Sequence, residues 1–230
     1  MNKCLSILLI IIIFQHPSFS QDQHLIDSIF DGLKAKENDT NKVKTINLLA
    51  YDYLGKDPNT SIYFSNEALK LSKKLNYSLG MAEAFLQMSS GKINIGNYEG
   101  ALKNCNEALN LFDQLLDTDS HPSAASILKQ KASTFQNLGT IYWHLNNYSE
   151  ALTSHNTSLR IREEIQDKQG IALSLNNIGI IYTELYDMPE ALKHYFAALK
   201  IREEIGDRGN IAASYVNIGI IFAERGEYAE

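Results

Sequence analysis

Apolar residues recur every three or four positions through much of the chain, which predicts amphipathic helices. In the clearest unit this spacing predicts one helix over residues 171–185 and a second over residues 191–201. Between them, Tyr186–Pro189 predicts a turn, because proline can open a helix at its first position but cannot continue one. The two glycines within residues 206–210 predict the end of the second helix. The predicted unit is therefore helix, short turn, helix, loop.

This unit is repeated along the chain. An Asn-Leu-Gly or Asn-Ile-Gly triplet recurs at steps of forty, at residues 137–139, 177–179 and 217–219. The segment Ile161–Ile165 returns unchanged as Ile201–Ile205. A glycine inside a helix costs about 1 kcal/mol relative to alanine. Its repetition indicates that another helix must approach closely at that point. A fixed period of this kind is the signature of a repeat architecture.

The repeated positions resemble the tetratricopeptide repeat. Its slots are occupied here by Leu175, Ile178, Gly179, Tyr182, Ala191, Tyr195 and Ala198. The unit before it supplies Phe135, Leu138, Gly139, Tyr142 and Ala151, and departs from the pattern at His155 and Ser158. The period of forty is similar to the long variant found in kinesin light chains and in exported or sensory proteins of the Bacteroidetes type. The resemblance implies an all-α fold, an α-α superhelix (TPR solenoid) of about four and a half helical hairpins.

The expected organisation follows from the register of the repeats. We expect a signal peptide at 1–20, a leading segment at 21–42, a degenerate hairpin at 43–80, hairpins at 81–120, 125–170 and 171–210, and the first helix of an incomplete hairpin at 211–230. The apolar face around Ile218, Ile221 and Phe222 would be covered by a following helix. Solenoids normally end in a polar cap. We therefore expect the chain to be a piece of a longer protein, or to self-associate through its uncapped C-terminal helix.

The N-terminus has the parts of a secretory signal. Lys3 precedes the apolar run Leu5–Phe14, and Ser18 and Ser20 place small side chains before a cleavage point at Gln21. The alternative is an uncleaved membrane anchor. A helix of such a run would rise only about 15 Å, against roughly 30 Å of hydrocarbon. We therefore predict export to the periplasm or cell envelope, and we find no later stretch long enough for a membrane span.

Composition narrows the choice of function. A formal net charge of −6 and the lack of a basic patch argue against nucleic acid as a partner. Cleavage of the signal would remove Cys4 and leave Cys105, which falls on an apolar face and is expected to be a buried, inert thiol. We find no catalytic motif and no histidine pair at metal-ligand spacing, so we expect no enzyme activity, no metal and no cofactor.

Two further groups of residues have structural interpretations. His155 occupies the aromatic slot of its unit and is expected to pack in the core. Arg160 and Lys200 precede Glu164 and Glu204 by four residues. This spacing predicts ion pairs on a solvated helix surface rather than paired catalytic carboxylates.

The resemblance implies that the first helix of each hairpin lines a concave, peptide-binding groove. The candidate groove residues are Asn137, Asn177, Asn217, Gln136, Trp143, Asn176, Glu184 and Glu224. A carboxamide can donate to and accept from a peptide backbone, and in kinesin-light-chain-like relatives such asparagines do so. The alternative is that each asparagine bonds a neighbouring helix and only sets repeat packing. Trp143 could be an exposed aromatic anchor or could pack on the preceding unit.

We therefore expect a non-catalytic scaffold that holds a protein or peptide ligand in its concave groove. The alternative is the sensory region of a larger bacterial signal-transduction protein, such as a histidine kinase, a nucleotide cyclase or a DNA-binding regulator.

Overall fold

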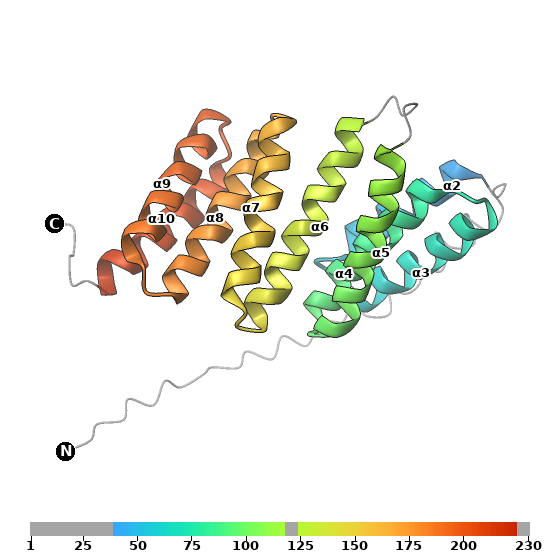
Figure 1. Cartoon of the computed structure of the whole chain (residues 1–230), viewed down its shortest axis with the longest axis horizontal. Coiled ribbons are helices and arrows are strands. Elements are labelled where there is room, and N and C mark those ends of the chain that lie inside the picture. Colours follow the sequence, from blue (N-terminus) through green and yellow to red (C-terminus); the bar gives the residue numbers. More distant parts are fainter. Residues whose placement is uncertain (1–38, 118–123, 225–230) are drawn as a thin grey trace, which may run out of the picture. The chain divides into compact units, whose positions relative to one another are not determined.

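The computed structural model describes residues 39–117 and 124–224, with side chains to residue 223, and its regular structure in these ranges is entirely helical. The helices are α2 (Thr40–Tyr53), α3 (Pro58–Lys74), α4 (Ser78–Asn94), α5 (Tyr98–Leu116), α6 (Ala124–His144), α7 (Tyr148–Glu164), α8 (Lys168–Glu184), α9 (Met188–Glu204) and α10 (Arg208–Glu224) (Figure 1). The predicted all-α repeat superhelix is confirmed: within the described ranges there are four helix pairs, and α10 begins a fifth. The predicted signal peptide lies outside the described residues.

Each helix packs against the next one along the chain, and α2/α3, α4/α5, α6/α7 and α8/α9 pack extensively as pairs. Figure 1 shows the pairs following one another in order, from α2 in blue to α10 in red. The first helices of successive pairs also meet, α2 with α4 and α4 with α6. These contacts place α2, α4 and α6 side by side on one face of the stack.

The turns explain where each helix ends. Six of the described turns contain one residue with a left-handed backbone conformation. These residues are Asn76 (α3–α4), Gly96 (α4–α5), Asn146 (α6–α7), Gln166 (α7–α8), Tyr186 (α8–α9) and Gly206 (α9–α10). Several helices are capped at their start by a side chain that accepts a backbone N–H, as at Asp57, Asn97, Asp167 and Asp187. Glycine adopts a positive φ without strain, whereas Tyr186 adopts it with a Cβ and an exposed ring.

Two of the recurring glycines lie where the helices of a pair approach closely. A Cβ added at Gly139 would lie 2.5 Å from His155 Nε2, and one at Gly179 would lie 2.7 Å from Tyr195 Cε1. These distances confirm the predicted steric need for glycine. An added Cβ at Gly219 meets nothing within 4 Å. The described residues contain no helix that packs a ring onto it.

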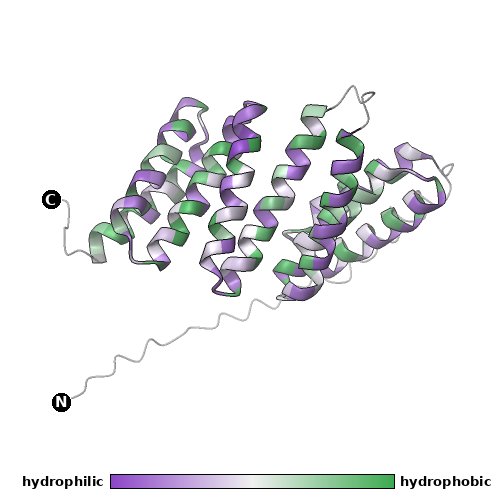
Figure 2. Cartoon of the chain, viewed as in Figure 1, coloured by the Kyte–Doolittle hydropathy of each residue, from purple (hydrophilic) through white to green (hydrophobic). Residues whose placement is uncertain are grey.

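The core is built largely from small and medium side chains between the helices of each pair. Ala151, Ala191 and Cys105 are fully buried. The predicted burial of Cys105 is confirmed, and this burial raises the pKa of its thiol to about 12. Figure 2 shows hydrophobic and hydrophilic residues mixed along the helices, as expected for amphipathic helices that bury one side. None of the helices within the described ranges is long and apolar enough to cross a bilayer.

Candidate binding groove

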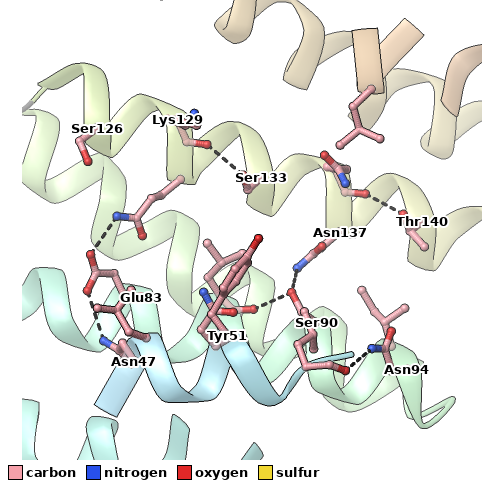
Figure 3. Close-up of a pocket in the computed structure, with 18 of the residues that line it drawn as sticks. Asn47, Tyr51, Glu83, Ser90, Asn94, Ser126, Lys129, Ser133, Asn137 and Thr140 are labelled. Carbon is pink, nitrogen blue, oxygen red and sulfur yellow. Dashed lines mark hydrogen bonds between the residues drawn. The ribbon is translucent and has the colours of Figure 1, made fainter. Parts of the chain in front are cut away.

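The first helices line an open groove of about 780 Å³ (Figure 3). Most of its residues come from α2, α4 and α6, with Leu54 just after α2 and one residue each from α7 and α8. They are Lys44, Asn47, Leu48, Tyr51, Leu54, Glu83, Leu86, Gln87, Ser90, Ile93, Asn94, Ser126, Lys129, Gln130, Ser133, Gln136, Asn137, Thr140, Arg162 and Leu173. The groove therefore lies on the face that the tetratricopeptide resemblance implies.

The lining combines amides and hydroxyls with exposed apolar side chains. Leu48 and Tyr51 are 65% and 62% exposed, respectively, although both are large hydrophobic residues. The lining includes three cations, Lys44, Lys129 and Arg162, and one carboxylate, Glu83; Lys129 also pairs with Asp167, outside the lining, at 3.6 Å. Glu83 is already engaged, since it accepts hydrogen bonds from Asn47 and Gln130 at 3.2 and 2.9 Å (Figure 3). The groove thus suits a ligand with polar backbone groups, some apolar side chains and negative charge.

Asn137 lies in this groove but is partly used within the fold. Its Nδ2 donates to Ser90 Oγ (Figure 3) and to Ser89 Oγ, both at 2.8 Å, and so joins α6 to α4. Gln136, its neighbour in the groove, accepts a hydrogen bond from Arg162 Nη2 at 2.6 Å. These contacts favour the packing interpretation for the donor side of Asn137.

Asn176 and Asn217 hold α8 and α10 together. Asn176 Oδ1 accepts from Asn217 Nδ2 at 3.1 Å and from Arg202 Nη1 at 3.2 Å. Asn176 is buried and Asn217 is half-buried. Here too the contacts favour a role in repeat packing.

Asn177 differs from the other two recurring asparagines. It is half-buried on α8, and its side chain makes no hydrogen bond to any described residue. It lines a small cavity together with Trp143, which is half-buried and stands 4.7 Å from the His144 ring. Trp143 therefore meets the following unit, α8. Glu184 is exposed at the end of that helix, and the side chain of Glu224 lies outside the described residues.

The helix pairs and their groove match a known repeat family. The tetratricopeptide repeat model matches residues 80–164 and 170–230, which is more than half of the chain. The chain belongs to the tetratricopeptide repeat family. Proteins of this family are generally non-catalytic scaffolds for protein interactions. A search of curated protein sequences finds no significant match.

Solved structures of tetratricopeptide repeat type share the fold at low identity. A Rap protein complexed with competence and sporulation factor aligns over 90% of this chain and 60% of its own, with 17% identity and a TM-score of 0.72. Aspartyl phosphate phosphatase F from Bacillus subtilis aligns over 77% of this chain and 44% of its own, with 16% identity and a TM-score of 0.66. The chain thus spans less than two thirds of either protein. A putative kinesin light chain from Podosopora anserina aligns over 81% of this chain and 88% of its own, with 12% identity and a TM-score of 0.57.

Sequence analysis does not single out the arginines of the repeated pentapeptide, and the tetratricopeptide stack buries both of them. Arg162 is 4% exposed, and its Nη1 donates to Gly170 O and Ser174 Oγ, both at 2.9 Å. Arg202 makes the equivalent bonds to Asn210 O and Ser214 Oγ at 3.0 and 2.6 Å. Each arginine thus ties a second helix to the start of the next unit. The sequence signal that could have identified them is that both arginines occupy the same position of the repeated pentapeptide.

The electrostatics of these arginines are set by burial. Desolvation lowers the pKa of Arg162 and of Arg202, and the nearby Asp167 and Asp207 oppose that shift. Arg162 donates only to neutral groups, and its Nε is buried without a hydrogen-bond partner. A buried guanidinium therefore reaches the groove wall with its charge only partly compensated.

The ion pairs predicted on the outer surface do not form. Among the described residues neither Arg160 with Glu164 nor Lys200 with Glu204 makes a salt bridge. Glu204 pairs instead with Lys168 at 3.1 Å, which joins the two helices of the α8/α9 pair. The carboxylates are nevertheless exposed, as a solvated surface requires. The described residues contain no group of three or more His, Cys, Asp or Glu side chains that could hold a metal ion.

Proposed function

We propose that this chain holds an extended segment of a partner protein in the groove lined by α2, α4, α6 and α8. The observation that carries the proposal is the groove itself, which combines amide and hydroxyl side chains with exposed apolar ones at Leu48 and Tyr51. Family membership supports a protein or peptide partner, because tetratricopeptide repeats serve as protein-interaction scaffolds. The Rap protein with a similar fold was solved in complex with a factor.

Amide side chains suit the recognition of an extended backbone, because each offers both a donor and an acceptor. The Oδ1 atom of Asn137 accepts no hydrogen bond from the described residues, and the carboxamide of Asn177 is likewise available. We assign these two groups to ligand binding, with Gln136, Trp143 and Glu184 around them. Asn176 and Asn217 contribute by fixing the position of α10.

Photo-cross-linking tests the proposal directly. A photoreactive phenylalanine analogue at Tyr51, in the groove, should capture a discrete partner, whereas the same analogue at Phe196, an exposed residue outside the groove, should not. Ser133→Phe should abolish the capture by filling the groove. This change is suited to the test because the Ser133 hydroxyl bonds only Lys129 O of its own helix. Equal capture from both positions, or capture that survives Ser133→Phe, would contradict a groove-bound ligand.

A second function is supported by the lengths of the similar proteins. The Rap protein and the phosphatase carry comparable helices within longer chains, of which the aligned parts are 60% and 44%. The groove could accordingly serve as the sensory region of a larger signalling protein, exported to the periplasm or cell envelope. In that case occupancy of the groove should change the activity of an output domain in the natural full-length protein. An output that does not respond to Ser133→Phe would exclude this function.

Self-association is a separate proposal for α10. The expectation that Ile218 and Ile221 await a covering helix is wrong, because both are buried against Ala191, Tyr195 and Leu199. The exposed apolar residues are instead Tyr215, Val216 and Ile220, at 56%, 61% and 49%, and the space over Gly219 is open. Such an apolar face suits a second copy of the chain. Sedimentation equilibrium should then show dimers that Val216→Glu dissociates, and a concentration-independent monomer would exclude them.

A further inference from the structure

A small cavity lies beside the groove, between α6, α7 and α8. Its volume is about 140 Å³, and its walls are Thr140, Trp143, His155, Asn177, Ile180 and Ile181. Thr140 also lines the groove, so the cavity adjoins the groove at this residue. Trp143 and Asn177 are only half-buried. The cavity is therefore within reach of a side chain from a ligand in the groove.

The next unit shows that the fold does not require this cavity. Forty residues further on, Tyr195 replaces His155 and Thr183 replaces Trp143. There the tyrosine ring packs on Gly179, and its hydroxyl reaches Thr183 Oγ1 at 3.2 Å. His155 packs on Gly139 in the same way, but its imidazole is shorter. The cavity thus follows from the particular side chains of the α6/α7 unit.

The walls favour an apolar occupant. Trp143, Ile180 and Ile181 supply a ring face and two branched aliphatic chains. His155 is neutral at physiological pH, because burial lowers its pKa to about 4. The polar walls are Thr140, Asn177 and His155, whose Nδ1 is buried without a hydrogen-bond partner. A cavity of about 150 Å³ has room for one aromatic ring. A charged group would lose its hydration here without gaining a partner of opposite charge.

We propose that this cavity is an anchor pocket that takes one apolar side chain, of phenylalanine or leucine size, from the groove-bound segment. Asn177 stands at the pocket with a free carboxamide and holds the backbone of the inserted residue. An aromatic wall such as Trp143 makes an inserted side chain a large contributor to affinity. The inference rests on the proposed groove function, but occupancy of the pocket can be measured without knowing the ligand.

Toluene, the side-chain analogue of phenylalanine, is the probe. Trp143 is the only tryptophan, so its emission reports on this pocket alone. Toluene should change that emission saturably in the millimolar range and should raise the melting temperature of the whole chain. Benzoate, a charged ring of similar size, should do neither at the same concentration.

Variants locate the site. His155→Tyr should weaken toluene binding at least tenfold, because it extends the side chain as Tyr195 does in the next unit. Thr140→Leu narrows the same cavity from the groove side and should also weaken toluene binding, which provides the test if His155→Tyr does not fold. Phe196→Ala is the matched control, since Phe196 is exposed and lines neither the groove nor the cavity, and it should leave toluene binding unchanged.

The outcomes separate this inference from the groove proposal. The anchor pocket is overturned if toluene gives no saturable response, or if the wild type, His155→Tyr and Thr140→Leu bind it equally. Neither result affects the cross-linking test from Tyr51. Toluene binding by the wild type, together with partner capture that is lost in His155→Tyr, supports the pocket as a ligand anchor, because His155 lines the cavity but not the groove. Toluene binding with partner capture unaffected by Thr140→Leu also overturns the anchor role.

Discussion

Replacing the repeated glycines with alanine tests whether close helix approach explains why glycine recurs at Gly139, Gly179 and Gly219. A Cβ added at Gly179 would lie 2.7 and 2.8 Å from two carbons of the Tyr195 ring. The ring cannot easily move away, because it is 3% exposed and its hydroxyl is hydrogen-bonded to Thr183. The equivalent Cβ at Gly219 would meet nothing within 4 Å. The same substitution at these two positions should therefore have opposite effects.

The magnitudes follow from two opposing terms. Replacing glycine with alanine inside a helix gains about 1 kcal/mol. In Gly219→Ala this gain is unopposed, so stability should rise by up to about 1 kcal/mol. In Gly179→Ala overpacking costs about 1–3 kcal/mol. The net result there should be no gain or a loss of up to about 2 kcal/mol, as the difference of the two terms.

Urea unfolding followed by far-UV circular dichroism provides the first measurement. Stacked repeats need not unfold in one step, so hydrogen exchange of α8 and α10 should be compared as a local readout. Gly139→Ala is a second test, because its Cβ would meet the buried His155 ring. If Gly179→Ala is stabilised as much as Gly219→Ala, the steric explanation of the repeated glycine is refuted.

Four further predictions concern single positions. Tyr186→Gly should raise stability by about 1 kcal/mol, because Tyr186 holds a φ of 58° that glycine adopts without strain, and an unchanged urea midpoint would argue against this. Burial lowers the pKa of His155 from 6.5 to about 4, so on acidification the unfolded chain binds the proton before the folded chain does. The free energy of unfolding should therefore fall between these two pH values, by up to about 3 kcal/mol more in the wild type than in His155→Gln. Parallel pH profiles of the two proteins would contradict this prediction. Asn177→Ala should weaken partner capture without loss of stability, whereas Asn217→Ala should speed hydrogen exchange in α10, and the reverse pattern would disprove these assignments. N-terminal sequencing of the exported protein should begin at Gln21, while an uncleaved chain in the membrane fraction would indicate an anchor.

Much of the fold could be predicted from local chemistry. Helix periodicity, the turn at Tyr186–Pro189 and the glycines of the repeated triplets act within one hairpin, and a period of forty carries them along the chain. Sequence alone therefore determined the helix pairs, their order, and the buried positions of Cys105 and His155. These features depend on contacts between residues close in sequence or related by the repeat.

The tertiary structure decided how the units meet. Asn137 finds its partners on α4, nearly fifty residues earlier, and Arg162 turns inward to Gly170 and Ser174 instead of joining the solvated surface around it. The cavity beside Trp143 likewise depends on three helices from two units. A long polar side chain can reach solvent or a neighbouring unit from the same helical position. Its choice depends on the space and the hydrogen-bond acceptors that the neighbouring unit presents, and these exist only once the units are stacked.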